Sequence, residues 1–280
     1  MFGLGDNFYT RFAFGNLPLH NVCLVTPWPQ VYWDLGCKFG KPKRIGLRTQ
    51  EDNLKQKFDW VDYGHIDIQP VYDSTKQQNV IAQLEAFIRK YPGTKLKQSF
   101  PLKQEWQKVS AINKPICLIR PNTLRKEWMC PARNPKNSYL QIFIDTYKKY
   151  FYFISIANLK HNEEEYEEPL KNTDLELLNE PIESVFNLFN LAHLMVCSQS
   201  FWWPLSLALK KHTIILYGSH LPHEKFTDTR FDTSNVTVIQ PEPFDLQPVT
   251  SFKAKKEIPF AVLMSNFEER VRKCLEFTKV

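Results

Sequence analysis

A glycine-rich turn followed by a carboxylate opens the chain. Gly3 and Gly5 flank Leu4, and Asp6 comes next, ahead of an apolar and aromatic segment that runs to Phe14. Glycine lacks a Cβ and tolerates positive φ, so a turn of this kind suits a close approach of the backbone to a ligand. The pattern favours a ligand beside Asp6, and the alternative is a turn that only shapes the chain.

Cations and a hydroxyl group follow the apolar run Ile116 to Ile119. The next loop, residues 120–128, holds Arg120, Thr123, Arg125 and Lys126. Guanidinium and ammonium groups neutralise phosphates, while a hydroxyl and loop amides supply directed hydrogen bonds. We therefore expect this loop to hold a diphosphate, and the alternative is an exposed basic loop.

Two further loops place small polar residues or glycine after apolar runs. Ser198 and Ser200 follow the run Leu194 to Cys197 and precede a short helix, whose N-terminus could receive an anion. Gly218 lies after the next apolar run, in a turn that a ligand can approach. Ser198, Ser200 and Gly218 thus join the expected diphosphate site, although the aromatic residues 201–203 also suit a buried core.

Basic residues cluster in the first third of the chain, near aromatic ones. The cations are Lys38, Lys41, Lys43, Arg44 and Arg48. Trp28, Tyr32 and Trp33 lie close by in the sequence. Cations track nucleic-acid phosphates, and an aromatic ring can stack on an unstacked or flipped base. We therefore expect the cluster, with Trp28 and Trp33, to bind an acceptor such as duplex DNA; core packing is the alternative for the rings.

Composition narrows the class of protein. The 280 residues carry a net charge of +6, which favours anionic ligands such as nucleotide phosphates, nucleic acid or an acidic membrane surface. No apolar run is long enough for a membrane span, the start lacks the pattern of a secretory signal, and the six cysteines lie far apart. We expect a cytoplasmic protein with reduced thiols and no integral membrane association. His220 and His223 share a loop without further ligands, so no metal site is expected.

The elements that must position these residues alternate between strands and helices. Short runs typical of buried strands occupy residues 21–26, 116–119, 151–156, 194–197, 213–217 and 236–239. Amphipathic helices are expected around residues 77–90, 139–146, 182–191, 204–210 and 261–278. Residues 116–239 read as β-α-β units with right-handed crossovers, and ligands bind such sheets beyond the carboxyl ends of their strands.

The order of these motifs resembles that of the bacterial heptosyltransferase-like glycosyltransferases. Four places carry the resemblance: Gly3-Leu4-Gly5-Asp6, Ile119 to Trp128 with its Pro-x-x-x-x-Lys-x-Trp pattern, Leu191 to Leu209, and Leu216-Tyr217-Gly218. It implies an α/β protein of the GT-B fold, with two Rossmann-like doubly wound lobes and a cleft between them. The expected division is an acceptor-side lobe at 1–110, a nucleotide-sugar-binding lobe at 111–258, and a C-terminal helix at 259–280 that packs back on the first lobe.

The resemblance also implies a reaction. Asp6 becomes the candidate general base, with Gly3 and Gly5 shaping the cleft wall beside it. It would remove the proton of an acceptor hydroxyl that attacks the anomeric carbon of a nucleotide-diphosphate sugar. The transfer is expected to be inverting and to require no metal, because cations and helix N-terminal amides stabilise the leaving group.

Donor-binding roles carry over to matching positions. Thr123 and Lys126 match residues that hold the donor diphosphate, and Arg125 assists them. The glutamate that holds the nucleotide ribose is expected at Glu163 or Glu165, in an acidic run that would otherwise be a solvated loop.

Two features depart from the family. Residues 198–203 stand where the family usually has an Asp-x-Gly-x-x-His segment, so its acidic and histidine contacts to the donor are missing. Family members also begin with a strand that leads into the glycine turn, whereas this chain starts almost at the turn.

The acceptor is open to several interpretations. The Lys-, Asn- and aromatic-rich sequence resembles bacteriophage proteins, some of which glycosylate hydroxymethylated pyrimidines in their own DNA. The favoured expectation is transfer to hydroxymethylcytosine in phage DNA, in the host cytoplasm. One alternative is a transferase acting on lipopolysaccharide or another surface glycan, for which the basic lobe would face acidic lipid. Another is a noncatalytic protein that binds nucleotide or nucleic acid.

Overall fold

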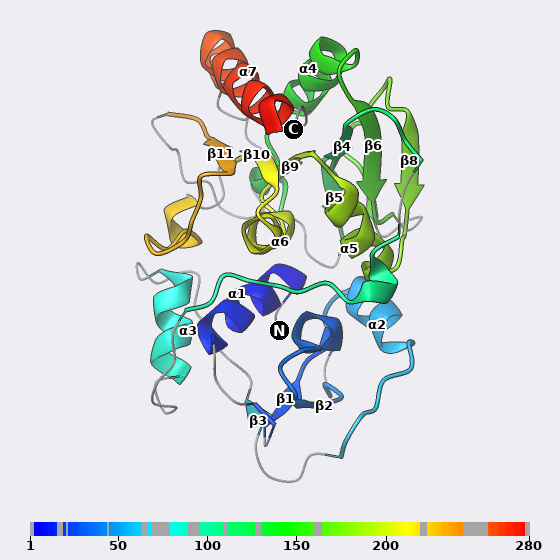
Figure 1. Ribbon diagram of the computed structural model, residues 1–280, viewed down its shortest axis with the longest axis vertical. Helices are drawn as coiled ribbons and strands as arrows, with labels where there is room; N and C mark the ends of the chain where they lie inside the picture. Colours follow the sequence, from blue (N-terminus) through cyan, green and yellow to red (C-terminus); the bar gives the residue numbers. More distant parts are fainter. Residues whose placement is uncertain are drawn as a thin grey trace. The chain divides into compact units, whose positions relative to one another are not determined.

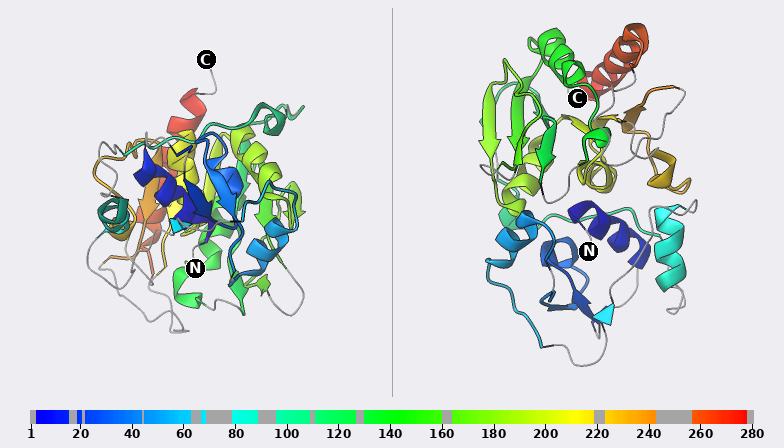
Figure 2. Two further views of the ribbon diagram at one scale, coloured as in Figure 1. Left: turned by 90° about the horizontal axis from the view of Figure 1, so that it is seen from below. Right: turned by 180° about the vertical axis from the view of Figure 1, so that it is seen from behind.

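The computed structural model of the chain divides into two compact units (Figures 1 and 2). The first comprises Met1–Pro101 and Glu224–Asp232, and the second comprises Leu102–His223 and Thr233–Val280. The structure describes residues 3–15, 19–20, 22–43, 45–62, 67–68, 79–88, 96–108, 111–126, 130–159, 164–218, 223–242 and 257–277.

The second unit is built on a parallel sheet with the strand order β11-β10-β9-β4-β6-β8. Its strands are β4 (Ile116–Ile119), β6 (Tyr152–Ala157), β8 (Leu175–Leu178), β9 (Leu194–Ser198), β10 (His212–Leu216) and β11 (Val236–Ile239). Numbered along the chain, the order from β8 to β11 is 3-2-1-4-5-6, that of a nucleotide-binding doubly wound sheet. The predicted doubly wound arrangement is therefore confirmed.

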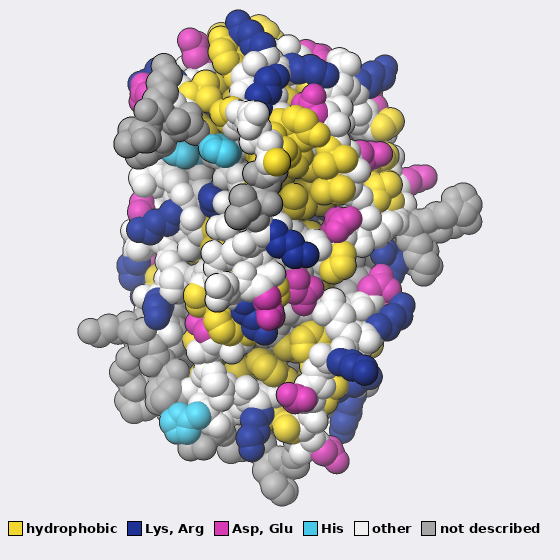
Figure 3. All heavy atoms as spheres, turned by 45° about the vertical axis from the view of Figure 1, so that its right-hand side comes forward, with side chains coloured by type: hydrophobic (Ala, Val, Ile, Leu, Met, Phe, Trp, Pro, Cys, Tyr) yellow, Lys and Arg dark blue, Asp and Glu magenta, His cyan; other side chains and the backbone are white. Residues whose placement is uncertain are grey.

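Of the six strands of this sheet, β8 is the one without a predicted counterpart. It pairs with β6 at an edge of the sheet, and its Leu175 and Leu178 are 39% and 41% exposed. A strand that is largely open to solvent lacks the continuous buried run that marks the other strands. Figure 3, which brings this side of the molecule forward, shows apolar side chains gathered at the surface.

Helices cover both faces of this sheet. Helices α4 (Asn137–Tyr147) and α7 (Phe260–Phe277) share one core cluster with the strands and lie side by side in Figures 1 and 2. The rings of Phe143 and Phe267 are 4.9 Å apart. Helices α5 (Ile182–Leu191) and α6 (Trp202–Leu209) contact β4 and β10, and their buried residues lie outside that cluster, on the opposite face.

The C-terminal helix belongs to the second unit. The resemblance implies packing on the first lobe, which stays a prediction; in the second unit α7 contacts β10 and β11 and buries Leu263, Phe267, Val271 and Cys274. None of the described helices combines the length and apolar character needed to cross a membrane.

The first unit contains a small parallel sheet with the order β2-β1-β3. The strands are β1 (Cys23–Val25), β2 (Lys38–Gly40) and β3 (Asp67–Ile68), and the helices are α1 (Leu4–Phe14), α2 (Arg48–Leu54) and α3 (Val80–Ile88). Helix α1 packs on α3 and buries Phe8, Phe12 and Phe14 completely. The strand at 21–26 and the helix at 77–90 are thus confirmed in β1 and α3. Helix α1 was not predicted, because its glycine-rich start suggests a turn.

Short elements complete the chain. The 3-10 helices are η1 (Pro29–Tyr32), η2 (Gln104–Trp106), η3 (Pro131–Arg133) and η4 (His223–Lys225), and strands β5 (Thr123–Arg125) and β7 (Glu164–Tyr166) form an antiparallel pair. Helix η3 and the β5–β7 pair lie in the loops that follow the strands of the second unit, so they contribute to its candidate site.

Candidate functional site

Arg120 lies at the point where the strand order of the second sheet reverses, between β4 and β9. Doubly wound sheets bind ligands beyond the strand ends at this point. The Arg120 backbone N–H donates to the Val196 carbonyl at 2.9 Å, which ties the start of the loop to β9. Its Nη1 lies 3.5 Å from Ser198 Oγ, and its Nη2 lies 3.5 Å from Thr123 Oγ1. These contacts are long, hence weak, for hydrogen bonds. The fold thus brings one cation and two hydroxyl groups to its usual ligand-binding place.

The charge around Arg120 is predominantly positive. Burial, and after it the neighbouring Arg125 and Arg133, lower the pKa of Arg120 to about 10, while Glu164 opposes this shift. The guanidinium is cationic at neutral pH, yet its surroundings disfavour the charge. A bound anion would offset this penalty by pairing with the guanidinium. The electrostatics therefore suit a phosphate or diphosphate.

Arg125 is held in a buried ion pair. The antiparallel pairing of β5 with β7 places it opposite Glu164. Its Nε donates to Glu164 Oε1 at 2.8 Å, and the Glu164 side chain is completely buried. Because the Arg125 guanidinium already pairs with this carboxylate, Arg125 contributes less to anion binding than its position in the sequence indicates. Its contact holds the β5–β7 pair together beside Arg120.

The other predicted ligands near this pair are exposed or lie outside the described residues. Lys126 follows β5 and is exposed. Glu165 lies opposite Leu124 in the pair and is also exposed. Glu163 lies outside the described residues. The donor role of Lys126 and the ribose role of Glu163 or Glu165 therefore stay predictions.

Two buried asparagines fasten the loops around Arg120. Asn122 Nδ2 donates to the Pro135 carbonyl at 2.9 Å. Asn134 Nδ2 donates to the Thr123 carbonyl at 3.1 Å and to Glu167 Oε2 at 3.2 Å. The Glu167 backbone N–H in turn donates to the Asn122 carbonyl at 3.0 Å. These bonds join three loops into one network, which holds the site in place before a ligand binds.

Gly218 follows β10 and packs closely against η3. A Cβ on Gly218 would lie 2.4 Å from the Ala132 carbonyl oxygen and 2.8 Å from the carbonyl carbon and oxygen of Arg133. Only glycine allows two backbone segments to approach so closely. Gly218 therefore helps to position the segment that carries Arg133, one of the cations near Arg120.

We expect Gly218→Ala to damage this site. The methyl group would have to displace the backbone of η3, at a cost of about 1–3 kcal/mol in the free energy of unfolding. Binding of a nucleoside diphosphate should weaken at least about tenfold, as one charge-assisted contact is misplaced. Chemical denaturation and titration calorimetry measure the two effects.

Gly36→Ala is the matched control. Gly36 has a φ of 69° in open space, so alanine there costs about 1–2 kcal/mol through backbone strain alone. It should lower stability comparably while leaving nucleotide affinity unchanged. Wild-type affinity in Gly218→Ala would contradict the role of this contact.

Ser200 accepts a hydrogen bond at the start of helix α6. Its Oγ accepts a hydrogen bond from the Trp202 backbone N–H at 3.3 Å, whereas Ser198 is buried at the end of β9 beside Arg120. Burial raises the pKa of the neighbouring Cys197 thiol to about 12, so this sulfur is a neutral packing group rather than a nucleophile. Of the two predicted serines, the structure places Ser198 against Arg120.

In the first unit, Asp6 caps helix α1. The Gly3 backbone N–H donates to Asp6 Oδ2 at 2.7 Å, and the helix begins at Leu4. Gly3 has an extended φ of −69°, and Gly5 lies inside the helix. In place of the expected glycine turn, Gly3 is the N-cap of α1 and Gly5 lies in its first turn, where the Asp6 carboxylate pairs with a backbone N–H. The general-base role of Asp6 stays a prediction.

The two tryptophans near the basic cluster make their contacts within the first unit. Trp28 is only 5% exposed. Trp33 is partly buried and donates from Nε1 to the Pro101 carbonyl at 2.8 Å. A ring that is packed in a core cannot also stack on a base, so Trp28 is a core residue.

The cations of the cluster differ in their surroundings. Lys38, Lys41 and Lys43 are exposed, whereas Arg48 forms an ion pair in α2, with its Nη1 3.1 Å from Asp52 Oδ2. Arg44 lies outside the described residues. An acceptor role for this cluster stays a prediction.

Arg120 and Arg133 are the candidate residues without an individual role among the expectations from the sequence. Arg120 was counted among the loop cations, and Arg133 was not considered. Arg133 lies between Pro131 and Pro135, and prolines restrict the backbone of such a loop. The position of Arg133 between two prolines, in a loop that follows a buried strand, was the signal that could have identified it as a site residue. Within the described ranges, no group of three or more His, Cys, Asp or Glu side chains could hold a metal ion.

Solved glycosyltransferases share the fold of this chain. A family 9 glycosyltransferase from Veillonella parvula DSM 2008 aligns with 86% of this chain and 84% of its own, at 12% identity and a TM-score of 0.53. TibC, a dodecameric iron-containing heptosyltransferase from enterotoxigenic E. coli, in complex with ADP-D-beta-D-heptose, aligns with 90% of this chain and 76% of its own, at 10% identity and a TM-score of 0.50.

A third structure covers less of the molecule. The E. coli heptosyltransferase WaaC with ADP aligns with 71% of this chain, at 14% identity and a TM-score of 0.43, and the match spans 59% of the WaaC chain. No protein-family model and no curated protein matches the sequence. The first two matches identify the GT-B type of fold, so the activity has to be argued from the residues of the site.

Proposed function

We propose that this protein transfers a sugar from a nucleoside-diphosphate sugar to an acceptor hydroxyl. The observation that carries the proposal is the position of Arg120 between Thr123 and Ser198, at the switch point of a Rossmann-like sheet. A sugar diphosphate is anionic, and negative charge grows on its leaving oxygen as the bond to the sugar breaks. Donors that are already in place stabilise this charge without further reorganisation.

In the proposed reaction, the Asp6 carboxylate accepts the proton of the acceptor hydroxyl. The hydroxyl oxygen then forms a bond to the anomeric carbon, and the bond from that carbon to the diphosphate oxygen breaks with inversion. The nucleoside diphosphate departs with the electron pair, and Arg120 stabilises its charge. Asp6 belongs to the first unit and Arg120 to the second. Variants at Asp6 should therefore lose transfer, whereas variants at Arg120 should also lose donor binding.

For the acceptor we favour a glycan hydroxyl, such as one of lipopolysaccharide core, over a hydroxymethylated pyrimidine in DNA. The DNA hypothesis depended on aromatic rings beside the basic cluster, and Trp28 is buried in the core. Arg48 is paired with Asp52, which reduces its availability for phosphates. The exposed lysines suit an acidic glycan or lipid as well as DNA. A glycan acceptor is therefore the simpler hypothesis.

The test is a panel of nucleotide sugars, including the ADP-heptose present in the TibC structure, with either a lipopolysaccharide core or hydroxymethylated duplex DNA as acceptor. We expect release of nucleoside diphosphate and a mass gain of one sugar on the glycan. A parallel reaction with a chelator asks whether a metal participates. A product on DNA would restore the DNA acceptor. Nucleotide binding without hydrolysis or transfer would support the noncatalytic alternative, and no nucleotide binding would refute the proposal.

A further inference from the structure

The crossover between β10 and β11 leaves the second unit. These strands are parallel neighbours in one sheet, and connections between such strands usually contain a helix packed on the same sheet. Here the residues Glu224–Asp232 group with the first unit instead. We name this segment the strap. Gly218 of the candidate site comes shortly before it in the sequence, and β11 follows it.

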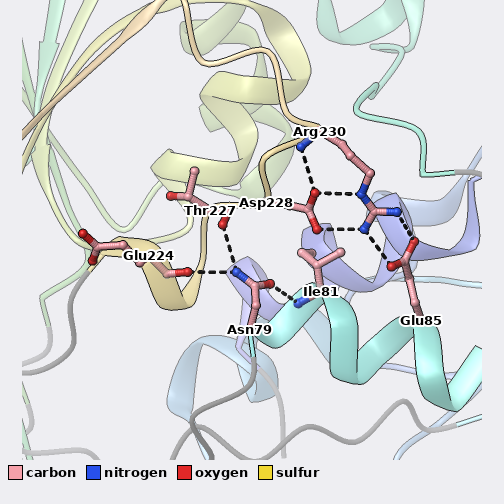
Figure 4. A network of polar contacts seen from close by, with 7 residues as sticks. All are labelled: Asn79, Ile81, Glu85, Glu224, Thr227, Asp228 and Arg230. Carbon is pink, nitrogen blue, oxygen red and sulfur yellow. Dashed lines mark hydrogen bonds and ion pairs between the residues drawn. The ribbon is translucent and has the colours of Figure 1, made fainter.

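Asn79 fastens the first half of the strap (Figure 4). Its Nδ2 donates to the carbonyl oxygens of Glu224 and Thr227, each at 2.9 Å. Its Oδ1 accepts the Ile81 backbone N–H at 2.8 Å, at the start of α3. One side chain therefore caps a helix and holds two carbonyl groups of the strap.

Arg230 fastens the second half to the same helix. Its Nη1 and Nη2 donate to the two carboxylate oxygens of Glu85 in α3, at 2.8 and 2.7 Å. Its Nε and Nη2 donate to the two oxygens of Asp228, both at 2.7 Å (Figure 4). Hydrogen bonds from Arg230 lower the pKa of Asp228. A guanidinium that bridges two carboxylates defines one geometry, which a single flexible ion pair would not.

Aromatic rings pack the strap against helix α1. Phe226 stacks on Tyr9, with ring centroids 5.9 Å apart and planes inclined by 28°. Phe231 meets Phe12 edge to face at 5.6 Å. Both strap phenylalanines are buried, so the strap is part of the core around α1. Tyr9 lies three residues after Asp6, and residues at this spacing are neighbours on the surface of a helix.

We propose that the strap holds helix α1 in position for catalysis, and that Arg230 is a positioning residue for Asp6. The inference rests on the proposed function. The chain on either side of the strap belongs to the donor-binding unit, through Gly218 before it and β11 after it. Nucleotide binding at the cationic site therefore acts on α1 through the backbone itself. The strap couples occupancy of the donor site to the helix that carries the proposed base.

The test compares Arg230→Ala with wild type in sugar transfer and in hydrogen exchange with and without ADP. In wild type, ADP should slow exchange in residues 120–126 and also in the strap and α1. In the variant, the slowing in α1 should disappear, while ADP affinity stays within about twofold and the transfer kcat falls about tenfold. The Arg230 side chain is 49% exposed, so its removal should leave the protein folded.

Arg272→Ala is the matched control, because Arg272 also pairs with a carboxylate but lies on α7. It should behave as wild type in every measurement. If Arg230→Ala does not fold, Glu85→Gln weakens the same bridge more gently and carries the same expectations. Unchanged kcat and unchanged slowing in α1 would overturn the positioning role. Absence of slowing in 120–126, together with absence of binding of every nucleoside diphosphate of the panel by wild type, would instead overturn the proposed function, and the positioning role with it.

Discussion

Asp6→Asn is expected to lower the rate of sugar transfer by about 10²- to 10⁴-fold, the usual contribution of a general base. The amide cannot accept the proton of the acceptor hydroxyl. Its oxygen can still accept the hydrogen bond from Gly3, which Asp6 receives at 2.7 Å. Helix α1 should therefore remain capped, with a loss of about 0.3–1 kcal/mol from the missing charge at the helix N-terminus. Transfer kinetics, donor titration and thermal melting separate chemistry, binding and stability.

The control for this variant is Asp59→Asn, which removes an exposed carboxylate from the same unit. It should retain wild-type transfer. An Asp6→Asn protein that transfers sugar normally would remove Asp6 from the mechanism. Loss of transfer together with a large drop in melting temperature would show that the carboxylate matters for the fold rather than for proton transfer.

Arg120→Met should weaken the binding of nucleoside diphosphates about 100-fold, or about 2.7 kcal/mol, because it removes a charge-assisted contact at the switch point. The stability of the ligand-free protein should stay the same or rise. Burial and neighbouring arginines lower the pKa of Arg120 to about 10, so the folded state disfavours its charge, and methionine removes that penalty. Weaker binding without lower stability distinguishes a ligand-binding arginine from a structural one.

Arg270→Met provides the contrast. Arg270 is 4% exposed, and it donates from Nε to Thr237 Oγ1 and from Nη1 to the Ser234 carbonyl, both at 2.9 Å. Its removal takes one hydrogen bond from the partly buried Thr237 hydroxyl and another from the Ser234 carbonyl, at a cost of about 1–3 kcal/mol in all. We expect lower stability and wild-type nucleotide affinity. An Arg120→Met protein that loses stability as Arg270→Met does, or that binds nucleotide normally, would refute the assigned site.

Several elements of the second unit were predictable from the sequence because their patterns are local. Buried parallel strands are continuous apolar runs, and the runs that became β4, β9 and β10 are bounded by turn residues. The edge strand β8 was missed because its leucines are exposed. Helix α1 was missed because glycine disfavours helices, whereas here the Asp6 cap and the buried phenylalanines outweigh that preference.

The candidate site was predictable in part. The loop after β4 and the serine at the end of β9 were predictable, since strand ends meet at one edge of a parallel sheet. The expected diphosphate ligands were Thr123 and Lys126, assisted by Arg125, which pairs with Glu164; Arg120 had no individual role, and Arg133 had none at all. That choice depends on a pairing across 39 residues of chain, and residue types alone do not specify such a pairing.

The sequence by itself therefore determined the alternation of strands and helices and the positions of the loops that bear phosphate-binding residues, because apolar periodicity and turn chemistry act over a few residues. Only the tertiary structure decided which cation meets the hydroxyl groups, which one is neutralised, and that a segment between β10 and β11 packs against α1. The physical reason is that charge, burial and ring packing depend on neighbours brought together by the order of the strands, and those neighbours lie far apart along the chain.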